Sequence, residues 1–301
     1  MLDVHRLRLL RELSQRGTLA AVADALGYTP STVSHQLSVL EKEAGVQLLQ
    51  PRGRGVQLTS AAHALVAHAE IIIEQLEQAD AELQNFTRGL FGRVRIATFQ
   101  TASRFLALDT LHLLTERHPQ LEVELTTHEY EQALPGLVAR ECDFVIGESY
   151  PGNPLKKVRG VEYEALFDDP LVLAWPTQLG LEPGKNTLQE LASFPWVMEP
   201  EGSFARQWSV AACRRAGFEP DVRFDSGDVF LHVQMVEEGL AAALLPGLVW
   251  HGSSPTVPTL QLSGLDATRN VFTAVRSGGG QNPIAIAIRQ ALRDSLKTMN
   301  A

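Results

Sequence analysis

Residues 18–45 constrain the fold of this chain most strongly, because they predict two short helices separated by a glycine turn. Apolar residues recur at helical spacing up to Leu26, and Gly27 stands where the first helix is expected to end. A second helix is predicted to begin at Pro30, since Thr29 can cap it and proline is tolerated at the first helical position. This pattern is typical of a helix-turn-helix, and an ordinary αα-hairpin is the alternative for the stretch taken alone.

The second predicted helix has two different faces. Its apolar positions Val33, Leu37 and Leu40 point one way, toward a predicted core. The opposite face carries hydroxyl groups and an imidazole, which can form hydrogen bonds with phosphates or with base edges. The candidate DNA-contacting residues of this segment are Thr29, Ser31, Thr32, Ser34, His35 and Ser38.

A basic turn follows the helix pair. Short apolar strands are predicted at 46–49 and 56–58, joined by a glycine-containing turn that holds Arg52 and Arg54. A hairpin in this position is typical of a winged helix-turn-helix, whose basic tip can follow the DNA backbone or enter the minor groove. A solvated turn without a ligand is the alternative for these arginines.

A long helix is predicted over about residues 60–88, because apolar side chains recur there at alternating spacings of four and three residues. Thr59 can cap this helix, which would be roughly 40 Å long at 1.5 Å per residue. Its narrow apolar stripe favours pairing with the same helix of a second copy, and packing along its own chain is the alternative. The predicted dimerisation residues are Leu65, Ala69, Ile72, Leu76, Ala79, Leu83 and Phe86.

The chain resembles LysR-type transcriptional regulators over its whole length. The N-terminal pattern of that family has an apolar first helix, an Ala-rich second helix, a Ser-rich third helix ending in LE-x-E-x-G, and a GRGV-x-LT wing. These parts fall here at residues 7–13, 20–26, 31–45 and 53–59. Pro51 departs from the family, which usually has a basic residue there, and Arg52 is the nearest substitute.

The resemblance implies an α/β protein of three parts. These are a winged helix-turn-helix DNA-binding domain at 1–60, a dimerisation helix at 61–90, and an effector-binding domain at 91–301. The last is expected to have two Rossmann-like lobes of the periplasmic-binding-protein type, with lobe one at 91–160 and 268–301 and lobe two at 161–267. The implied partners are promoter DNA, other copies of this chain in a dimer or tetramer, and a small-molecule effector, with RNA polymerase as a further candidate.

The residue pattern of the C-terminal part agrees with such a domain, because strands alternate with helices from Gly92 onward. A capping box is also predicted at 187–190. Strands are predicted at 94–97, 121–125, 143–147, 170–175, 196–198 and 271–275. Helices are predicted at 105–117, 133–140, 203–216, 229–238 and 284–296.

Ligands of such α/β folds bind at the carboxyl ends of strands, close to helix N-termini. Glu148 could bind a ligand amine there while helix N–H groups bind a carboxylate, so an amino-acid-like or carboxylate effector is expected. For Glu148 a solvated surface position is the alternative, and for Thr101, Ser103 and Ser203 the alternative is simple helix capping. The candidate effector-contacting residues are Phe99, Gln100, Thr101, Ser103, Glu148, Ser149, Gly202, Ser203 and Phe204.

Charge is distributed unevenly along the chain, whose formal net charge is −9. Residues 1–60 carry seven basic and five acidic side chains, residues 61–90 carry one and five, and residues 91–301 carry 18 and 25. The negative charge therefore lies outside the predicted DNA-binding module. Because that module is only weakly positive, DNA binding is expected to need dimerisation and direct base contacts.

The sequence indicates neither a metal site nor a catalytic set. His63 and His68 lack the spacing of zinc ligands, and the glycines at 278–280 do not match a phosphate-binding loop. Cys142 and Cys213 are too few for a disulfide framework. Peroxide-sensing relatives pair two cysteines in lobe two, but only Cys213 matches here. We therefore expect neither thiol switching nor a cofactor.

The start of the chain and its apolar segments predict a cytoplasmic location. Residues 1–13 interleave arginine with leucine and so lack the apolar core of a signal peptide. The longest apolar stretch, at 240–250, is too short for a membrane span and contains Pro246. The alternative to a regulator is a cytosolic solute-binding or enzymatic domain whose N-terminal helices only drive dimerisation.

Overall fold

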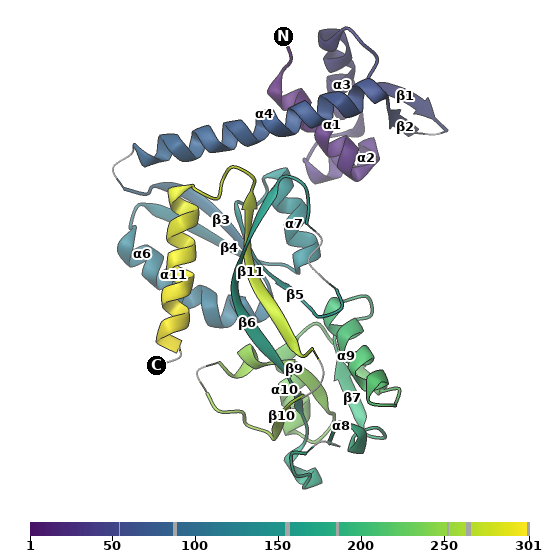
Figure 1. Cartoon of the computed structure of the whole chain (residues 1–301), viewed down its shortest axis with the longest axis vertical. Helices are drawn as coiled ribbons and strands as arrows, with labels where there is room; N and C mark the ends of the chain where they lie inside the picture. The colour runs from purple at the N-terminus through teal and green to yellow at the C-terminus, as the bar shows by residue number, and fades with distance from the viewer. Residues whose placement is uncertain are drawn as a thin grey trace.

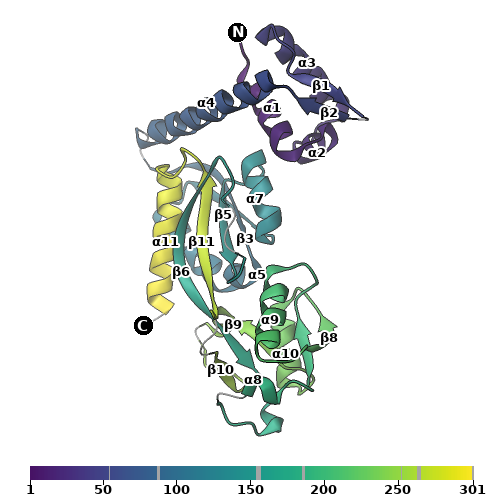
Figure 2. The same ribbon diagram turned by 45° about the vertical axis from the view of Figure 1, so that its right-hand side comes forward.

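The computed structural model describes residues 1–53, 55–86, 89–153, 157–184, 187–251, 253–262 and 266–299. Three parts follow one another along the long axis of the molecule: an N-terminal helical module, a long helix that crosses the molecule, and two α/β lobes (Figure 1). Figure 2 presents the same order from another side, with lobe two farthest from the N-terminal module. The predicted fold class is therefore confirmed.

The N-terminal module contains three helices, α1 (Val4–Arg16), α2 (Leu19–Ala25) and α3 (Pro30–Ala44). The hydroxyl of Thr29 accepts a hydrogen bond from the N–H of Thr32 at 3.2 Å, so α3 begins at the predicted residue. Val33, Leu37 and Leu40 are buried in the core of the module. Burial of each such side chain contributes about 1.5–3 kcal/mol, which fixes which face of α3 points outward.

The wing is an antiparallel hairpin of β1 (Leu49–Arg52) and β2 (Gly55–Leu58). The first strand, predicted at 46–49, begins only at Leu49 in the structure, so its predicted boundaries are wrong. The carboxylate of Glu41 accepts the N–H groups of Leu48 and Leu49 at 2.8 and 2.9 Å, which ties the entrance of the hairpin to α3. Pro51 fits in β1 because a two-stranded hairpin has outer edges at which proline is tolerated.

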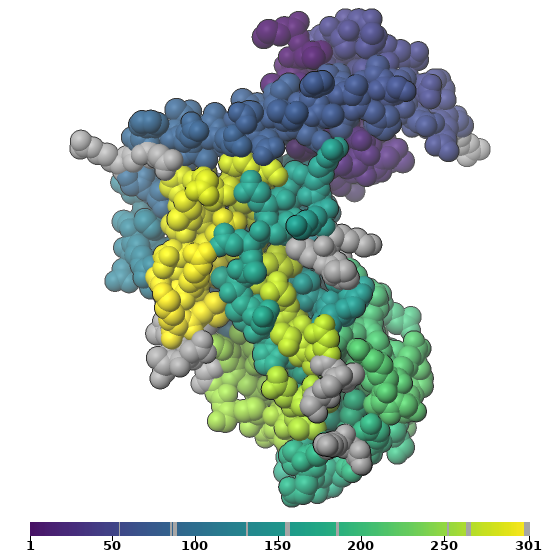
Figure 3. Space-filling model, in the orientation of Figure 1, coloured from purple at the N-terminus to yellow at the C-terminus, as the bar shows by residue number. Residues whose placement is uncertain are grey.

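The long helix α4 (Ser60–Asn85) begins after the Thr59 cap, as predicted. The predicted end at residue 88 lies outside the described residues. Ala62, Val66 and Ala69 pack into the core of the N-terminal module, so the first part of α4 belongs to that module. The remainder of α4 lies across the top of lobe one, where Figure 3 shows its surface against the side chains of that lobe.

Lobe one is built on a mixed sheet whose strands run in the order β4, β3, β5, β11, β6. The first three strands are mutually parallel, as the βαβ pattern predicts, whereas β11 is antiparallel to both β5 and β6. The strands are β3 (Gly92–Thr98), β4 (Leu121–Thr127), β5 (Phe144–Ser149), β6 (Val161–Ala174) and β11 (Thr268–Arg276).

Helices cover both faces of this sheet (Figure 1). The pair α6 (Leu108–Arg117) and α11 (Pro283–Met299) packs on one face through Leu114, Ile288 and Leu292, and α7 (Tyr130–Ala139) packs on the other. The helix predicted at 105–117 starts earlier than expected. A short helix, α5 (Gln100–Ala102), and a π-helical turn (Ser103–Ala107) precede α6 without a break, because polar residues after β3 form the first turns of the helix.

Lobe two contains a parallel pair of strands, β7 (Pro195–Met198) and β8 (Asp221–Asp225), and two strands antiparallel to β6, β9 (Ala243–Pro246) and β10 (Thr259–Gln261). Its helices are α8 (Thr187–Glu190), α9 (Phe204–Arg215) and α10 (Val229–Glu237). Trp175, Trp196 and Trp208 are buried at its centre. The sequence pattern does not indicate β8, β9 and β10, because they are short and β9 lies inside an unpatterned apolar run.

The chain passes between the lobes within strands rather than in loops. From Val161 to Pro170, β6 pairs with β11 in lobe one, and from Leu171 onward it pairs with β9 and β10. Residues 161–170, which the sequence analysis assigns to lobe two, therefore lie in the sheet of lobe one. A junction made of paired strands limits the relative movement of the lobes to bending and twisting of two hydrogen-bonded strands.

Candidate functional site

The outward face of α3 presents the predicted polar side chains to solvent. Ser31, Thr32, His35 and Ser38 are exposed, and Ser34 is half-buried. The Thr29 hydroxyl lies 2.8 Å from those of Ser31 and Thr32, so these three groups already bond to one another at the helix start. The side chains left to contact base edges are therefore those of Ser34, His35 and Ser38. Helix α3 lies on the side of the module away from lobe one in Figures 1 and 2.

The wing presents one of the two predicted arginines to solvent. Arg52 is exposed at the end of β1, whereas the sequence places it within the turn. Arg54 lies outside the described residues. A second basic group, Arg6 on α1, donates to Gln36 at 3.1 Å and to Glu43 at 2.8 Å. Because those bonds hold α1 against α3, we assign Arg6 to the orientation of α3 and not to contact with DNA.

The predicted apolar stripe on α4 is divided between two environments. Ala69 is fully buried in the core of its own module, and Leu65 packs against that core. The prediction that these two residues belong to a seam between subunits is therefore wrong. The reason is that α1 covers this part of α4. The rest of the stripe lies at the surface, and the exposed residues are Ile72, Leu76, Ala79, Leu83 and Phe86.

A buried guanidinium lies between the lobes. Arg269, near the start of β11, donates to the carboxylate of Asp169 at 2.7 and 2.8 Å and to the hydroxyl of Thr101 at 2.8 Å. It also bonds to the carboxylate of Glu148, and its guanidinium carbon lies 5.1 Å from the centre of the Phe99 ring. Three predicted effector residues thus surround an arginine that the sequence analysis missed.

A cavity of 180 Å³ opens beside this cluster, between the two lobes. Lobe two contributes the residues that begin α9 and the loop before it, and lobe one contributes the ends of β5 and the start of α7. Its lining residues are Glu129, Tyr130, Glu148, Tyr150, Glu199, Pro200, Ser203, Phe204, Ala205 and Gly227.

Two of the lining carboxyl groups bind protons unusually tightly. Burial raises the pKa of Glu148 to about 7, and although Arg269 opposes this change, Glu129 and Asp169 add to it. Burial also raises the pKa of Glu199 to about 8, and repulsion from Glu148 and Glu129 adds to that effect. Burial and mutual repulsion therefore keep these two carboxyl groups partly protonated near neutral pH.

The other predicted effector residues lie near the cavity without lining it. Gln100 bridges the lobes, because its amide donates to Asp228 at 2.9 Å and accepts from the N–H of Val229 at 3.1 Å. Ser103 accepts from Thr127, and Ser149 ends β5. Gly202 has a positive φ of 94°, which forms the turn into α9.

Two missed residues differ in how readily the sequence could have indicated them. Glu199 directly follows the predicted strand 196–198, so the rule that ligands bind at the carboxyl ends of strands would have included it. Arg269 stands at the beginning of a strand, and only the antiparallel direction of β11 places it in the crevice. No local signal in the sequence indicates that reversal.

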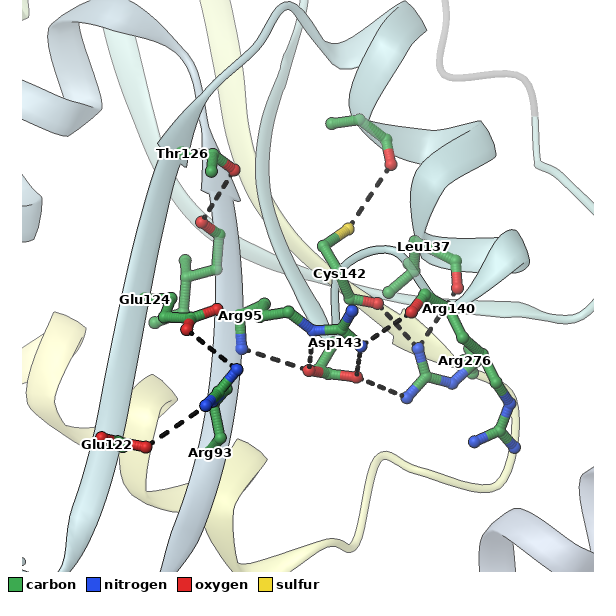
Figure 4. A network of polar contacts seen from close by, with 12 residues as sticks. Arg93, Arg95, Glu122, Glu124, Thr126, Leu137, Arg140, Cys142, Asp143 and Arg276 are labelled. Atoms are coloured by element: carbon green, nitrogen blue, oxygen red, sulfur yellow. Dashed lines mark hydrogen bonds and ion pairs between the residues drawn. The ribbon is translucent and has the colours of Figure 1, made fainter. Parts of the chain in front are cut away.

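A second polar network fastens α4 to the opposite edge of lobe one. The buried carboxylate of Glu77 on α4 bonds to Arg140 and to Arg276, the latter at 3.4 Å. Arg276 also donates to Asp143 at 3.1 Å, and Asp143 accepts from the backbone and side chain of Arg95 (Figure 4). A cavity of 580 Å³ lies here, but its charged groups are largely paired with one another.

The close approach of α4 to lobe one also requires a glycine. Gly278 has a positive φ of 87°, and a Cβ atom there would lie 2.5 Å from the carbonyl oxygen of Glu74 on α4. Any other residue would force the helix away from the lobe. The glycine run that follows β11 is therefore a docking turn for α4.

Both cysteines are buried and form no disulfide. Burial raises the pKa of Cys142 to about 11 and that of Cys213 to about 12. The thiolate is the reactive form of cysteine, so neither thiol is activated at neutral pH. Cys142 lies in the core beneath α7 and Cys213 in the core of lobe two.

Among the described residues, none of the helices combines the length and the apolar character that a bilayer crossing demands.

Comparison with known proteins reveals matches along nearly the whole chain. A family model described as a bacterial regulatory helix-turn-helix protein of the lysR family matches residues 4–63, and one described as a LysR substrate binding domain matches residues 87–297. The chain is 27% identical to a probable hydrogen peroxide-inducible genes activator of Streptomyces viridosporus, covering 94% of this chain and 95% of the relative. It is 24% identical to the transcriptional dual regulator GltC of Bacillus subtilis, covering 84% of each.

Solved structures share the fold. Full-length OxyR from Pseudomonas aeruginosa, in a variant form, aligns with a TM-score of 0.62 at 20% identity and covers 97% of this chain and 95% of that chain. CbnR, a LysR family transcriptional regulator, aligns with a TM-score of 0.54 at 24% identity and covers 97% of this chain and 100% of that chain. The two family models and the sequence relatives, in contrast, support a regulator and not the alternative of a solute-binding or enzymatic domain.

Proposed function

The chain belongs to the LysR family of transcriptional regulators, and from that premise we propose which residues read its DNA and which hold its effector. It is a DNA-binding transcriptional regulator with a small-molecule-binding domain. Like its DNA, it resides in the bacterial cytoplasm. The domains are a reader at 1–60, the linking helix at 61–90 and the effector-binding domain at 91–301.

The reader contacts DNA through α3 and the wing. Ser34, His35 and Ser38 lie where an exposed helix face can enter the major groove, while Arg52 lies beside the adjoining backbone. Thr29, Ser31 and Thr32 begin α3, where helix N–H groups and hydroxyls suit phosphate contacts. Full-length CbnR has been solved in complex with its target DNA, and its fold resembles that of this chain.

The protein acts as a dimer, which further associates into a tetramer. Ile72, Leu76, Leu83 and Phe86 are exposed on one side of α4, where water contact with large apolar side chains is unfavourable. The same helix of a second copy would cover them and would place two readers at the spacing of two half-sites.

Replacing Leu76 with glutamate is expected to weaken the dimer by about 100-fold or more. Two copies of the side chain leave the seam, and each contributes about 1.5–3 kcal/mol when buried. Gln75→Glu adds the same charge at an exposed neighbouring position and is expected to leave the dimer intact. Sedimentation velocity over a concentration series measures both. Equal behaviour of the two variants would contradict the seam.

The crevice cavity holds the effector. Glu148 and Glu199 supply carboxylates for an amine, and the N–H groups at the start of α9 face the same space for a carboxylate. An amino-acid-like molecule carries both groups. Three residues of lobe one support the site. The Phe99 ring packs against the guanidinium of Arg269, and Thr101 accepts a hydrogen bond from it. Gln100 bridges to lobe two.

One observation carries the link between effector and DNA. The neighbouring strands β5 and β11 each run from the crevice to the α4 network. Glu148 and Arg269 lie at their crevice ends, while Arg276 at the other end of β11 and Asp143 just before β5 hold α4 through Glu77. A ligand that rearranges the first pair therefore acts on strands that also hold α4, and effector and DNA must then alter each other's affinity reciprocally.

A salt-series titration of the full-length protein tests this function. With about two to three phosphate contacts per reader, the affinity of a dimer for DNA from upstream of its own gene should fall with a log–log slope of about −4 to −5. Binding to a scrambled sequence should be weaker at each salt concentration. Fluorescence anisotropy measures both. Equal affinity for the two sequences would contradict sequence-specific reading of that region.

A further inference from the structure

We propose that the effector of this regulator is a small cationic amine, held in the crevice by carboxylates and aromatic rings that line a single cavity. The inference rests on the proposed function, since it concerns the ligand of the same crevice. Of the two charged groups of an amino-acid-like effector, the amine is the one that the protein recognises. An effector that carries only a carboxylate does not fit.

The charges around the cavity do not balance. Glu148 and Glu199 line it, and Asp169 lies just behind them. Two guanidinium groups approach these carboxyl groups, those of Arg269 and Arg206, but Arg206 donates to the backbone carbonyl of Glu199 at 3.1 Å and pairs with Asp225. Arg269 is already bonded to Asp169 and Glu148. Within the part of the chain that the structure describes, Glu199 forms no ion pair, and its hydrogen-bond partner is the hydroxyl of Ser203. A ligand cation would supply the positive charge that the cluster lacks.

The rest of the lining suits a cation for an independent reason. Tyr130, Tyr150 and Phe204 contribute three aromatic side chains, and none of the described lining residues is a lysine, arginine or histidine. The faces of aromatic rings attract ammonium groups by about 0.5–2 kcal/mol each, and such rings are a common means of recognising amines. Carboxylates and aromatic rings together therefore select a positive charge that has an apolar body.

The start of α9 opposes this preference only weakly. A helix N-terminus carries about half an elementary positive charge, which favours anions. Ser203 already accepts the N–H of Arg206 at 3.1 Å, so one of the free N–H groups is satisfied. Against this partial charge stand the carboxyl groups of Glu148 and Glu199, which ionise when they bind a cation, and the carboxylates prevail. A ligand carboxylate is accommodated only when an amine accompanies it.

The cavity volume limits the size of the amine. A volume of 180 Å³ equals the space of about six water molecules at roughly 30 Å³ each. A primary amine with a short aliphatic chain fits this space.

Proton release gives the proposal a second signature. The raised pKa values of Glu148 and Glu199 mean that these two carboxyl groups are partly protonated near neutral pH. The titratable and charged groups around them are Glu129, Tyr150, Asp169 and Arg269, with Arg206 and the Ser203 hydroxyl on lobe two. An ammonium group favours the ionised carboxylates, so its binding releases protons. Amine affinity should rise with pH through the range about 7 to 8, by up to tenfold per pH unit for each proton.

The experiment compares four probes of matched size on the full-length protein by thermal shift and calorimetry. n-Butylamine, n-butanol and butyrate share one carbon chain and differ in charge, and 2-aminobutyrate carries both charges. We expect n-butylamine to stabilise the protein, 2-aminobutyrate to do so as well, and n-butanol and butyrate to have no comparable effect. Stabilisation by n-butylamine should increase with pH over the stated range.

A pair of variants locates the binding. Glu199→Gln removes a cavity carboxylate with little change in shape, and it should weaken n-butylamine binding by at least tenfold. Glu201→Gln makes the same change at an exposed residue outside the cavity and should bind as the parent protein does. Circular dichroism of both variants checks that the fold is retained.

Three results would overturn the proposal: butyrate stabilising the protein as strongly as n-butylamine, Glu199→Gln leaving amine affinity unchanged, or no probe with an amine producing a shift. The upstream-DNA titration separates these results from failure of the proposed function. If DNA binding is sequence-specific and responds to butyrate, the function stands and only the ligand class is wrong. If DNA binding shows no sequence preference, the reader assignment fails whatever the crevice binds.

Discussion

Replacing Ser34 and His35 together with alanine is expected to weaken specific DNA binding by about 100-fold, with fold and dimer intact. Both residues lie on the outward face of α3, opposite the buried Val33 and Leu37. A lost contact to a base edge costs about 1–3 kcal/mol, and about 1.4 kcal/mol corresponds to tenfold in affinity. The loss should be confined to specific DNA, because contacts to base edges form only on the recognised sequence, whereas other DNA is held through its phosphates.

The measurement is fluorescence anisotropy with upstream and scrambled DNA at one fixed salt concentration. Ser14→Ala combined with His68→Ala serves as the control, since it removes the same two kinds of side chain from α1 and α4. That control should bind DNA as the parent protein does. An equal loss on upstream and scrambled DNA would instead place Ser34 and His35 at phosphates, and no loss on either would exclude α3 as the reading helix.

Replacing Arg269 with methionine is expected to destabilise the effector-binding domain by about 3–5 kcal/mol at pH 8, the range for breaking a buried ion pair. The side chain is 2% exposed and bonds to Asp169, Glu148 and Thr101 at once. Its removal leaves two carboxylates inside the protein without their cation. Their desolvation, which Arg269 now offsets, would no longer be compensated.

The loss should depend on pH in a direction that identifies its cause. Without Arg269, the folded-state pKa values of Glu148 and Asp169 rise farther above their unfolded values. The native state then binds more protons than the unfolded state, so its stability falls as pH increases. The variant should therefore be closer to the parent protein at pH 5 than at pH 8.

Denaturant unfolding of both proteins at the two pH values provides the measurement. Arg214→Met is the matched control, because Arg214 pairs with Glu219 at the surface, where an ion pair contributes little. Its unfolding curve should superimpose on that of the parent protein. A loss in Arg269→Met that is independent of pH would point to lost packing instead of uncompensated charge. The variant should also lose its response to n-butylamine if Arg269 positions Glu148.

Local patterns were sufficient to predict the reader in detail. Thr29, Pro30 and Gly45 mark the ends of α3 through backbone preferences that act over a few residues, so its boundaries agree with the structure. The apolar positions of α3 likewise select its buried face without help from distant residues. The wing was predicted less well, because a side chain from another element, Glu41, determines where β1 begins.

The seam on α4 illustrates the limit of periodicity. Alternating spacings of four and three correctly predict a helix with an apolar stripe, but they do not reveal what covers each part of it. Ala69 and Ile72 belong to the same stripe, yet the first is buried by its own chain and the second is 38% exposed. The difference in burial arises because α1, which is distant in sequence, packs against the first part of α4 and not against the rest of its stripe.

The sequence by itself determined the order of the modules, the helix-turn-helix, the long linking helix and the alternation of strands and helices after it, because caps, helical periodicity and strand patterns are local properties. The two-lobed arrangement was implied by the family resemblance. The tertiary structure alone decided the composition of the crevice. Arg269 and Asp169 are 100 residues apart and meet only because β11 runs antiparallel to β6. Glu199 joins them from the other lobe. Their pKa values and their preference for a cation follow from shared burial and mutual repulsion, which exist only once the chain has folded.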